Sequence, residues 1–382
     1  MQRGTFQLMK SVNKSIILNK VRTSEPISRA QIAKETKLTP PTVSSIVKEL
    51  LEEGIIRESS LGESQGGRKP TMLHINLDAF YVIGVDAGPQ RVTSILTDLA
   101  GNIIHRADKQ LFTPITNEQF MKILKDAIRE TIEASNREKR EMVGIGVAMH
   151  GVVNVETGTS LIAPNLNLKN IPIKEELEKE FELDIKVEND ARAMALGESW
   201  FGGHASASMV AVNIGHGVGA GLVINEKLYH GVRDIAGEIG HMTIDLHGPT
   251  CTCGNTGCLQ AFVSGPAIAA RSHKEGLTGE DIAKQAKSGD KEATALLEET
   301  GKLIGIGLVN LIHLVNPEKI VLGGGVMKSE KFILPAIKET ISSRGLTQDA
   351  KETNVSVTKL GAHATLLGAV ALLLVELFDP VG

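Results

Sequence analysis

The chain has 382 residues, of which 42% are hydrophobic and 23% are charged, and its net charge is −4. This length is too great for one compact core and predicts two or three domains, while the composition is typical of a soluble, globular protein. The aromatic fraction of only 3% excludes a stacking platform for single-stranded nucleic acid.

The charge is unevenly distributed along the chain. Residues 1–70 carry 12 Lys and Arg against 7 Asp and Glu, whereas the remaining residues carry 29 against 38. A basic head joined to an acidic body is typical of a nucleic-acid-binding module attached to a second unit. The first residues lack the apolar segment of a signal peptide, and cysteines kept as thiols suit a reducing compartment, so we expect a cytoplasmic protein.

The head, residues 1–76, predicts a helix-turn-helix. Apolar residues recur at helical spacing from Val12 to Val21, and Ser28 can cap a second helix, with Gln31 completing a capping box. After a short turn, Pro40 and Pro41 open a third helix that stops at Gly54. The polar residues on the outer face of this helix are Thr42, Ser44, Ser45 and Lys48.

A β-hairpin is expected to follow this helix and to form a wing. Residues 55–58 and 71–75 are strand-like, and the glycine-rich loop between them ends in Arg68 and Lys69, which can reach phosphates or the minor groove. The pattern favours a winged helix-turn-helix that binds duplex DNA, although a helical docking or dimerisation module is the alternative. The residues predicted to contact DNA are Ser28, Arg29, Gln31, Pro41, Thr42, Ser44, Ser45, Lys48, Arg68 and Lys69.

The body, residues 77–382, alternates strands and helices and predicts an α/β fold. Strands at 81–86, 91–97 and 103–107 form one meander, and strands at 209–214, 219–224 and 227–230 form another with its first turn at the same point. We interpret this repeat as an internal duplication, with ligand sites beyond the strand ends. The remaining predicted helices cover residues 117–135, 173–181, 293–314, 329–342 and 364–377, and strands cover 143–147, 185–187 and 319–322. The apolar run in the last helix is too short to span a bilayer and predicts a buried helix.

All three cysteines of the chain fall within eight positions. Cys251, Cys253 and Cys258 follow shortly after His241, and together they form the Cys3His set that structural zinc prefers. Three cysteines cannot all pair as disulfides, so an oxidised framework explains the cluster poorly. The alternative is a set of unligated thiols brought together by chance.

The same segment carries a family resemblance. Gly-Glu-Ile-Gly-His at 237–241, followed by Cys-Thr-Cys-Gly-Asn-Thr-Gly-Cys-Leu at 251–259, resembles the signature of the ROK family of repressors and sugar kinases. The head's Ser-Arg-Ala-Gln-Ile-Ala and Gly-Gly-Arg-Lys-Pro resemble the winged helix-turn-helix of the family's repressors, which its plain kinases lack. The resemblance implies a DNA-binding domain over 1–76 and, over 77–382, an actin-like (ribonuclease H-like) sugar-kinase core with lobes of about 77–188 and 189–382.

The resemblance also implies a sugar site. The residue matching Asp190 is the general base of family kinases, and Asn189 matches a sugar ligand, although a plain helix cap is the alternative for this pair. The other implied sugar contacts are Gly151, Glu238, His241 and Gln260, the last replacing a family glutamate. A zinc ion on one ring nitrogen of His241 would leave the other free to donate to a sugar hydroxyl.

The turns that hold phosphates in family kinases are altered. The first, residues 86–90, keeps Asp86 but replaces the hydroxyl residue and gains Pro89, which lacks a backbone N–H. The second, residues 215–217, has His216 in place of threonine, and only the third, residues 323–325, is intact. We therefore expect no catalysis, with Asp190 as the base if the chain were a kinase.

These observations predict a sugar-responsive transcriptional repressor. Its partners would be double-stranded operator DNA, an inducing monosaccharide (xylose is the first candidate) and a second copy in a homodimer or homotetramer, with structural Zn²⁺ and no membrane. The alternative is an ATP-dependent, glucokinase-like ROK sugar kinase with an N-terminal extension. A scaffold that does not bind DNA is a third hypothesis.

Overall fold

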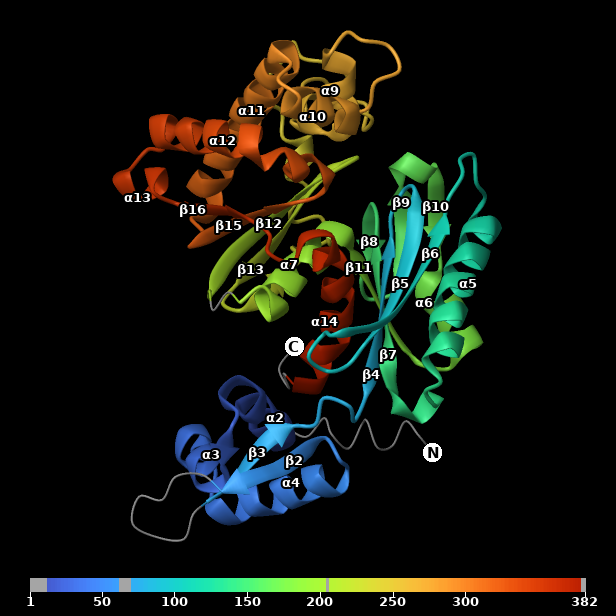
Figure 1. The fold of residues 1–382 in the computed structure, drawn as a ribbon, viewed down its shortest axis with the longest axis vertical. Coiled ribbons are helices and arrows are strands. Elements are labelled where there is room, and N and C mark those ends of the chain that lie inside the picture. The colour runs from blue at the N-terminus through green and yellow to red at the C-terminus, as the bar shows by residue number, and fades with distance from the viewer. Residues whose placement is uncertain (1–11, 62–69, 204–205, 379–382) are drawn as a thin grey trace.

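Two five-stranded sheets with the same strand order form the body of the protein (Figure 1). The computed structural model describes residues 12–61, 70–203 and 206–378. In each sheet an antiparallel meander of three strands is extended by two parallel strands beside its first strand. This repetition confirms the predicted duplication and the two-lobed α/β class.

The first sheet has the order β11-β7-β4-β5-β6 and the second the order β14-β13-β12-β15-β16. The strands of the first are β4 (Tyr81–Ala87), β5 (Arg91–Thr97), β6 (Ile103–Gln110), β7 (Met142–Met149) and β11 (Asp184–Asn189). Those of the second are β12 (Ser208–Ile214), β13 (Val218–Ile224), β14 (Lys227–Tyr229), β15 (Lys319–Gly323) and β16 (Asn354–Val357). A small sheet adds β8 (Val152–Asn154), β9 (Thr159–Ala163) and β10 (Leu168–Ile171) to the first lobe.

Helices cover the outer faces of both sheets. The first lobe carries α5 (Asn117–Ser135), which begins at a capping box formed by Thr116 and Gln119, and α6 (Ile173–Phe181). The second lobe carries α8 (Gln260–Val263), α9 (Gly265–Arg271), α10 (Gly279–Lys287), α11 (Lys291–Val315), α12 (Glu330–Arg344) and α13 (Gln348–Lys351). Short 3-10 turns lie at Lys139–Glu141, Pro164–Leu166, Ile239–His241, Gly325–Ser329 and Gly361–His363.

Two helices, α7 (Asp190–Phe201) and α14 (Ala364–Phe378), lie between the sheets (Figure 1). The backbones of the two helices touch at Gly368, where an added Cβ would lie only 1.8 Å from the Ala193 carbonyl oxygen. On its other side α14 packs against β4 and β7, so the last helix of the chain rests on the first sheet. Residues Gly361–Phe378 are long and apolar enough to cross a membrane, yet 61% of them are buried inside the protein, as the predicted buried helix requires.

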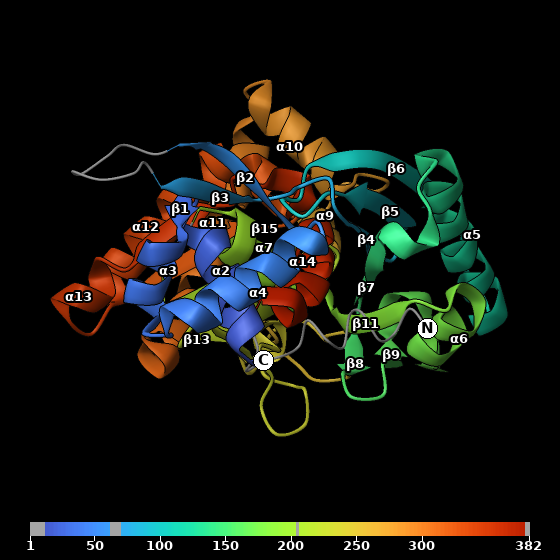
Figure 2. The same cartoon turned by 90° about the horizontal axis from the view of Figure 1, so that it is seen from below.

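In its described residues, the head combines three helices with a three-stranded wing (Figure 2). Its elements are α2 (Val12–Ser24), β1 (Ile27–Ser28), α3 (Arg29–Thr36), α4 (Pro40–Glu52), β2 (Ile56–Leu61) and β3 (Thr71–Ile75). The predicted hairpin is β2-β3, whereas β1, which pairs with β3, was not predicted. Ser28 caps α3, but the predicted capping box does not form, because the Gln31 side chain donates to Glu35 instead.

Candidate functional site

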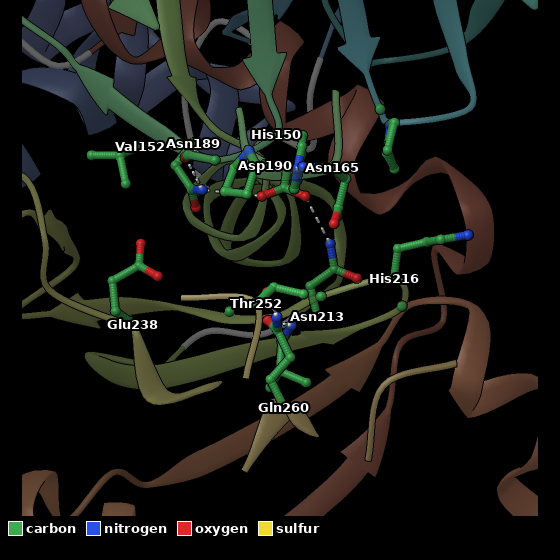
Figure 3. A pocket seen from close by; sticks show the side chains of 18 of the residues that line it. His150, Val152, Asn165, Asn189, Asp190, Asn213, His216, Glu238, Thr252 and Gln260 are labelled. Carbon is green, nitrogen blue, oxygen red and sulfur yellow. Dashed lines mark hydrogen bonds between the residues drawn. The ribbon is translucent and has the colours of Figure 1, made fainter. Parts of the chain in front are cut away.

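A cavity of about 260 Å³ lies between the lobes, where the carboxyl ends of β4, β7, β11 and β12 converge. Figure 3 shows side chains from both lobes pointing into it. Its polar and charged lining includes Asp86, His150, Asn165, Asn189, Asp190, Asn213, His216, Glu238, His241, Thr252 and Gln260. The structure therefore brings together every predicted sugar-site residue, since Gly151 also lines the cavity.

Asn189 joins three elements at the start of α7. Its side-chain oxygen accepts from the backbone N–H groups of Ala191 (3.0 Å) and Arg192 (3.1 Å), which caps the helix. Its amide donates to the Gly151 carbonyl at 2.8 Å and thereby ties α7 to the loop after β7. The helix-cap alternative is thus realised, and the same cap fixes the position of the neighbouring Asp190. A direct contact of Asn189 with sugar stays a prediction.

Asp190 is the central carboxylate of the cavity. One of its oxygens accepts from the Ala191 N–H at 2.9 Å, and the other lies 3.5 Å from the Asn213 amide nitrogen. Burial raises the pKa of Asp190, although the charge of His150 acts against this shift. Burial and the negative charge of Asp190 raise the pKa of Asp86 from 3.8 to about 7. The two carboxyl groups therefore hold protons more tightly than exposed acids do.

His150 was not among the predicted site residues. It follows β7 directly, and its Nε2 accepts from the Asn165 backbone N–H at 3.4 Å, which assigns the ring proton of the neutral form to Nδ1. Burial lowers the pKa of His150, and the negative charge of Asp190 opposes this shift. Its place at the carboxyl end of a parallel strand is the sequence signal that could have indicated it. Asn165, Asn213 and Thr252 are further lining residues that sequence reasoning missed.

Glu238 and His241 are placed by glycines. Gly237 has φ +95°, and a Cβ at this position would lie 1.8 Å from the Ala220 carbonyl oxygen. A Cβ at Gly240 would lie 2.1 Å from the Val218 carbonyl oxygen. The segment thus packs directly on the backbone of β13 and turns both side chains toward the cavity. Burial raises the pKa of Glu238, whose Oε2 lies 3.9 Å from the Nε2 atom of His241.

Gln260 is fixed at the wall of the cavity by both ends of its amide. Its Oε1 accepts from the Val218 N–H at 3.0 Å, and its Nε2 donates to the Thr252 hydroxyl at 3.2 Å. The glutamate of family kinases has no hydrogen to donate to Thr252 when ionised. At this wall of the cavity the substitution therefore replaces a group that only accepts hydrogen bonds by one that also donates.

A buried ionic network joins the lobes beside the cavity, and sequence reasoning missed it. Glu188 accepts from Arg192 Nε at 2.7 Å and lies 2.6 Å from His230 Nε2. Arg192 also donates to the Asp234 carbonyl at 2.7 Å, and the Asp234 carboxylate accepts from the Val155 N–H at 3.3 Å. Burial alone would raise the pKa of Glu188, but the contacts with His230 and Arg192 outweigh it and lower that pKa. The network fixes the segment that precedes Glu238.

The three cysteines and His241 converge as predicted. All four ligand atoms lie within 4.8 Å of one another, with Cys253 Sγ 3.8 Å from Cys258 Sγ and Cys251 Sγ 3.7 Å from His241 Nδ1. A tetrahedron with metal–sulfur bonds of about 2.3 Å has sulfur–sulfur edges of about 3.8 Å, so the cluster fits a tetrahedral metal ion. Nδ1 faces the cysteines, whereas Nε2 faces Glu238 at 3.9 Å.

The two altered phosphate turns also line the cavity, the first through Gly88 and Pro89 and the second through residues 215–217. In the second turn the Gly215 N–H donates to the Gly217 carbonyl at 2.9 Å, so this donor is used within the turn. In the third turn Gly324 has φ +88°, and a Cβ there would lie 2.4 Å from the Ile214 carbonyl oxygen. That glycine is therefore required for packing against β12, whether or not a nucleotide binds.

The predicted DNA contacts divide into three groups. On α4, Pro41, Ser44, Ser45 and Lys48 are exposed and Thr42 is half-buried. Before and within α3, Ser28 is used as a cap, Gln31 donates to Glu35, and Arg29 donates to Glu58 of β2 at 2.8 Å. Arg68 and Lys69 lie outside the described residues. Four of the five predicted contacts on α4 are thus open to solvent.

Comparison with known proteins agrees with this geometry. Residues 82–376 match the ROK family, and residues 17–57 match the winged helix-turn-helix DNA-binding family. The chain belongs to the ROK family. Its head and its sugar-kinase-like core are therefore those that the sequence motifs predicted.

Individual ROK proteins resemble the chain over different lengths. The xylose repressor of Caldicellulosiruptor bescii is 31% identical, covering 98% of each chain. A ROK family transcriptional regulator, homolog of the E. coli MLC protein, has a TM-score of 0.86 at 29% identity, covering 97% of each chain. The Streptomyces griseus ROK glucokinase, solved with glucose and AMPPNP, has a TM-score of 0.69 at 28% identity and covers 76% of this chain and 98% of its own.

Proposed function

We propose that the protein is a transcriptional repressor that releases operator DNA when a monosaccharide binds between its lobes. The observation that carries the proposal is a polar, two-lobed cavity on the same chain as a winged head with an exposed α4 surface. Resemblance over nearly the full length to a xylose repressor supports the proposal. D-Xylose is accordingly the first effector to test. The protein would act in the cytoplasm as a homodimer or homotetramer on an inverted-repeat operator.

The roles of the cavity residues follow from their chemistry. The carboxylates of Asp190 and Glu238 would accept hydrogen bonds from sugar hydroxyls, while the Nδ1–H of His150 and the Nε2–H of His241 would donate. Because each carboxylate lies near an imidazole, donor and acceptor pairs are available at two corners of the cavity. Such pairs suit a neutral polyhydroxyl ligand, whose hydroxyls both donate and accept.

A structural zinc ion would complete the site. Cys251, Cys253, Cys258 and the Nδ1 atom of His241 would hold it, and four protein ligands leave no open position for a reactive water. When bound, zinc would serve as a rigid anchor for its ligands. With Nδ1 bound to the metal, the proton of the neutral His241 ring would be on Nε2. This atom faces Glu238.

A thermal-shift panel followed by an operator-release assay tests the proposed function. Full-length protein is melted with D-xylose, D-glucose, N-acetylglucosamine and a non-carbohydrate polyol, because a ligand specific for the native state raises the melting temperature. A duplex selected from a random-sequence library by the sugar-free protein then serves as the operator probe. We expect one monosaccharide to raise the melting temperature and to weaken operator affinity about 5- to 150-fold. No stabilisation by any sugar, or no salt-dependent duplex binding, would contradict the proposal.

An ATP-dependent sugar kinase is the second candidate function. By sequence resemblance Asp190 matches the general base of family kinases, Asp86 remains in the first turn, and the ROK glucokinase is similar over the body. Coupled detection of ADP release with MgATP and the same sugars distinguishes the two functions. Because Gly215 is used within its own turn and Pro89 has no N–H, we expect no turnover above background.

A further inference from the structure

Two helices connect the cavity to the head. Helix α7 begins at Asp190 in the cavity, and helix α14 begins next to Thr365, which also lines it. With 12 and 15 residues, they extend about 18 Å and about 22 Å from the cavity. Trp200 in the last turn of α7 and Phe378 at the end of α14 then meet, with ring centroids 5.9 Å apart.

The two helices are packed so closely that they form one rigid pair. A Cβ on Gly368 of α14 would lie 1.8 Å from the Ala193 carbonyl oxygen of α7, and a Cβ on Gly197 of α7 would lie 2.4 Å from the Ala364 carbonyl oxygen of α14. Where the backbones of the two helices touch, no side chains lie between them that could change rotamer and absorb a movement. A displacement at their cavity ends is therefore carried to Trp200 and Phe378.

One cation of the head contacts the far ends of both helices. The guanidinium carbon of Arg22, on α2, lies 4.1 Å from the ring centroid of Trp200 and 5.6 Å from that of Phe378. Asn19 orients it by accepting from Arg22 Nε at 3.2 Å and Nη2 at 3.0 Å. Burial lowers the pKa of Arg22, as a cation held away from water requires. A partly desolvated guanidinium over an indole face is a strong and directional contact.

Helix α2 is in turn tied to the proposed DNA-reading helix. Lys14 of α2 has only 4% of its side chain exposed, and its Nζ lies 2.7 Å from a carboxylate oxygen of Glu53, which follows α4 directly. Apolar residues of α2 and α4, including Val21 and Val47, share one core with the end of α14. Beside the Arg22 contact, however, a cavity of about 1030 Å³ is lined by residues of α2, α7 and β14. The head therefore has room to shift around the Arg22 contact.

We propose that Arg22 is the positioning residue that couples the sugar cavity to the DNA-binding head. Sugar bound at the first turns of α7 and α14 displaces this pair, the aromatic rings at its far end move, and Arg22 carries α2 and α4 with them. The inference rests on the proposed function, since it needs both a sugar and an operator. It adds the residues through which one site affects the other.

The chain contains one tryptophan, so fluorescence reports on this contact directly. The wild-type protein is titrated with D-xylose, or with whichever sugar of the panel raises the melting temperature. We expect the emission of Trp200 to change with the same midpoint as sugar binding measured by calorimetry. A sugar that releases the operator without changing Trp200 emission would overturn the inference and leave the proposed function intact.

Variants at Arg22 test the coupling itself. Arg22→Gln removes the cation, and Arg22→Lys keeps the charge but loses the planar stacking surface. The matched control is Lys20→Gln on the same helix, because Lys20 pairs with Glu35 inside the head. For each protein, sugar affinity and operator affinity are measured separately, and the operator affinity is then measured again with saturating sugar.

We expect Arg22→Gln to bind sugar and, in its absence, the operator within about 3-fold of wild type, while the sugar-induced loss of operator affinity falls below about 2-fold. Arg22→Lys should retain an intermediate response and Lys20→Gln the full response. Full release of Arg22→Gln by sugar would overturn the inference, and so would loss of operator binding by both Arg22 variants without sugar. If the wild type itself binds no sugar, the proposed function fails instead.

Discussion

Replacing Asp86 with Asn tests the electrostatics of the cavity. Burial and the charge of Asp190 raise the pKa of Asp86 from 3.8 to about 7. Between about pH 4 and about pH 7 the folded protein therefore retains a proton that the unfolded chain has released. We compare the free energy of unfolding of wild type with that of a protein carrying a neutral side chain at this position. Wild type loses no stability below the pKa of Asp86 in the unfolded chain, and it loses stability as the pH rises to the pKa of Asp86 in the folded protein.

The magnitude follows from the size of the shift. Each pKa unit corresponds to about 1.4 kcal/mol, so the shift from 3.8 to about 7 corresponds to a loss of about 4 kcal/mol, an upper value because Asp86 is only partly enclosed. The Asp86→Asn variant should exceed the wild-type free energy of unfolding by about 1 kcal/mol near pH 4.5 and by up to about 4 kcal/mol at pH 8.

Urea unfolding followed by Trp200 emission measures this difference at each pH. Groups that do not interact with Asp86 titrate alike in both proteins and cancel in the comparison, whereas Asp190, whose charge acts on Asp86, contributes to the measured difference. Asp78→Asn, at an exposed position outside the cavity, is the matched control for the loss of one carboxylate. An Asp86→Asn difference that does not vary with pH, or that favours wild type at pH 8, would refute the reasoning.

Four further predictions concern packing, metal, sugar and DNA contacts. Gly368→Ala should lower the free energy of unfolding by about 1–3 kcal/mol, because its methyl group would overlap the backbone of α7, whereas Gly325→Ala, with open space around it, should have little effect in calorimetry. Purified protein should contain about one zinc ion per chain by mass spectrometry, and Cys258→Ser should remove it and lower the melting temperature. Asp190→Asn should weaken sugar affinity about 10-fold or more in calorimetry and leave operator affinity in the absence of sugar unchanged, whereas Lys48→Ala should weaken operator binding and reduce its salt slope by about one.

The sequence by itself determined the features that depend on residues near one another in the chain. Strand alternation, helix periodicity and turn glycines predicted the repeated meander and helices such as α5, because these patterns reflect local backbone preference and one buried face. The clustered cysteines predicted the convergence of three thiols with His241 because they lie close together in the chain, whereas the wall of the cavity around Glu238 followed from the family resemblance of this segment. Local capping was predicted only in part, since Gln31 had a competing partner in Glu35 on its own helix.

The tertiary structure alone decided the contacts between segments that are distant in sequence. The lone tryptophan and an arginine of the first described helix carry no local pattern that pairs them, yet Arg22 stacks on Trp200. Likewise, His150 enters the cavity and Glu188 meets His230 only because the two lobes close on each other around α7 and α14. How the lobes close depends on backbone contacts such as that of Gly368 with α7. The free energy of such contacts depends on the complete packing of the protein, which no short stretch of sequence encodes.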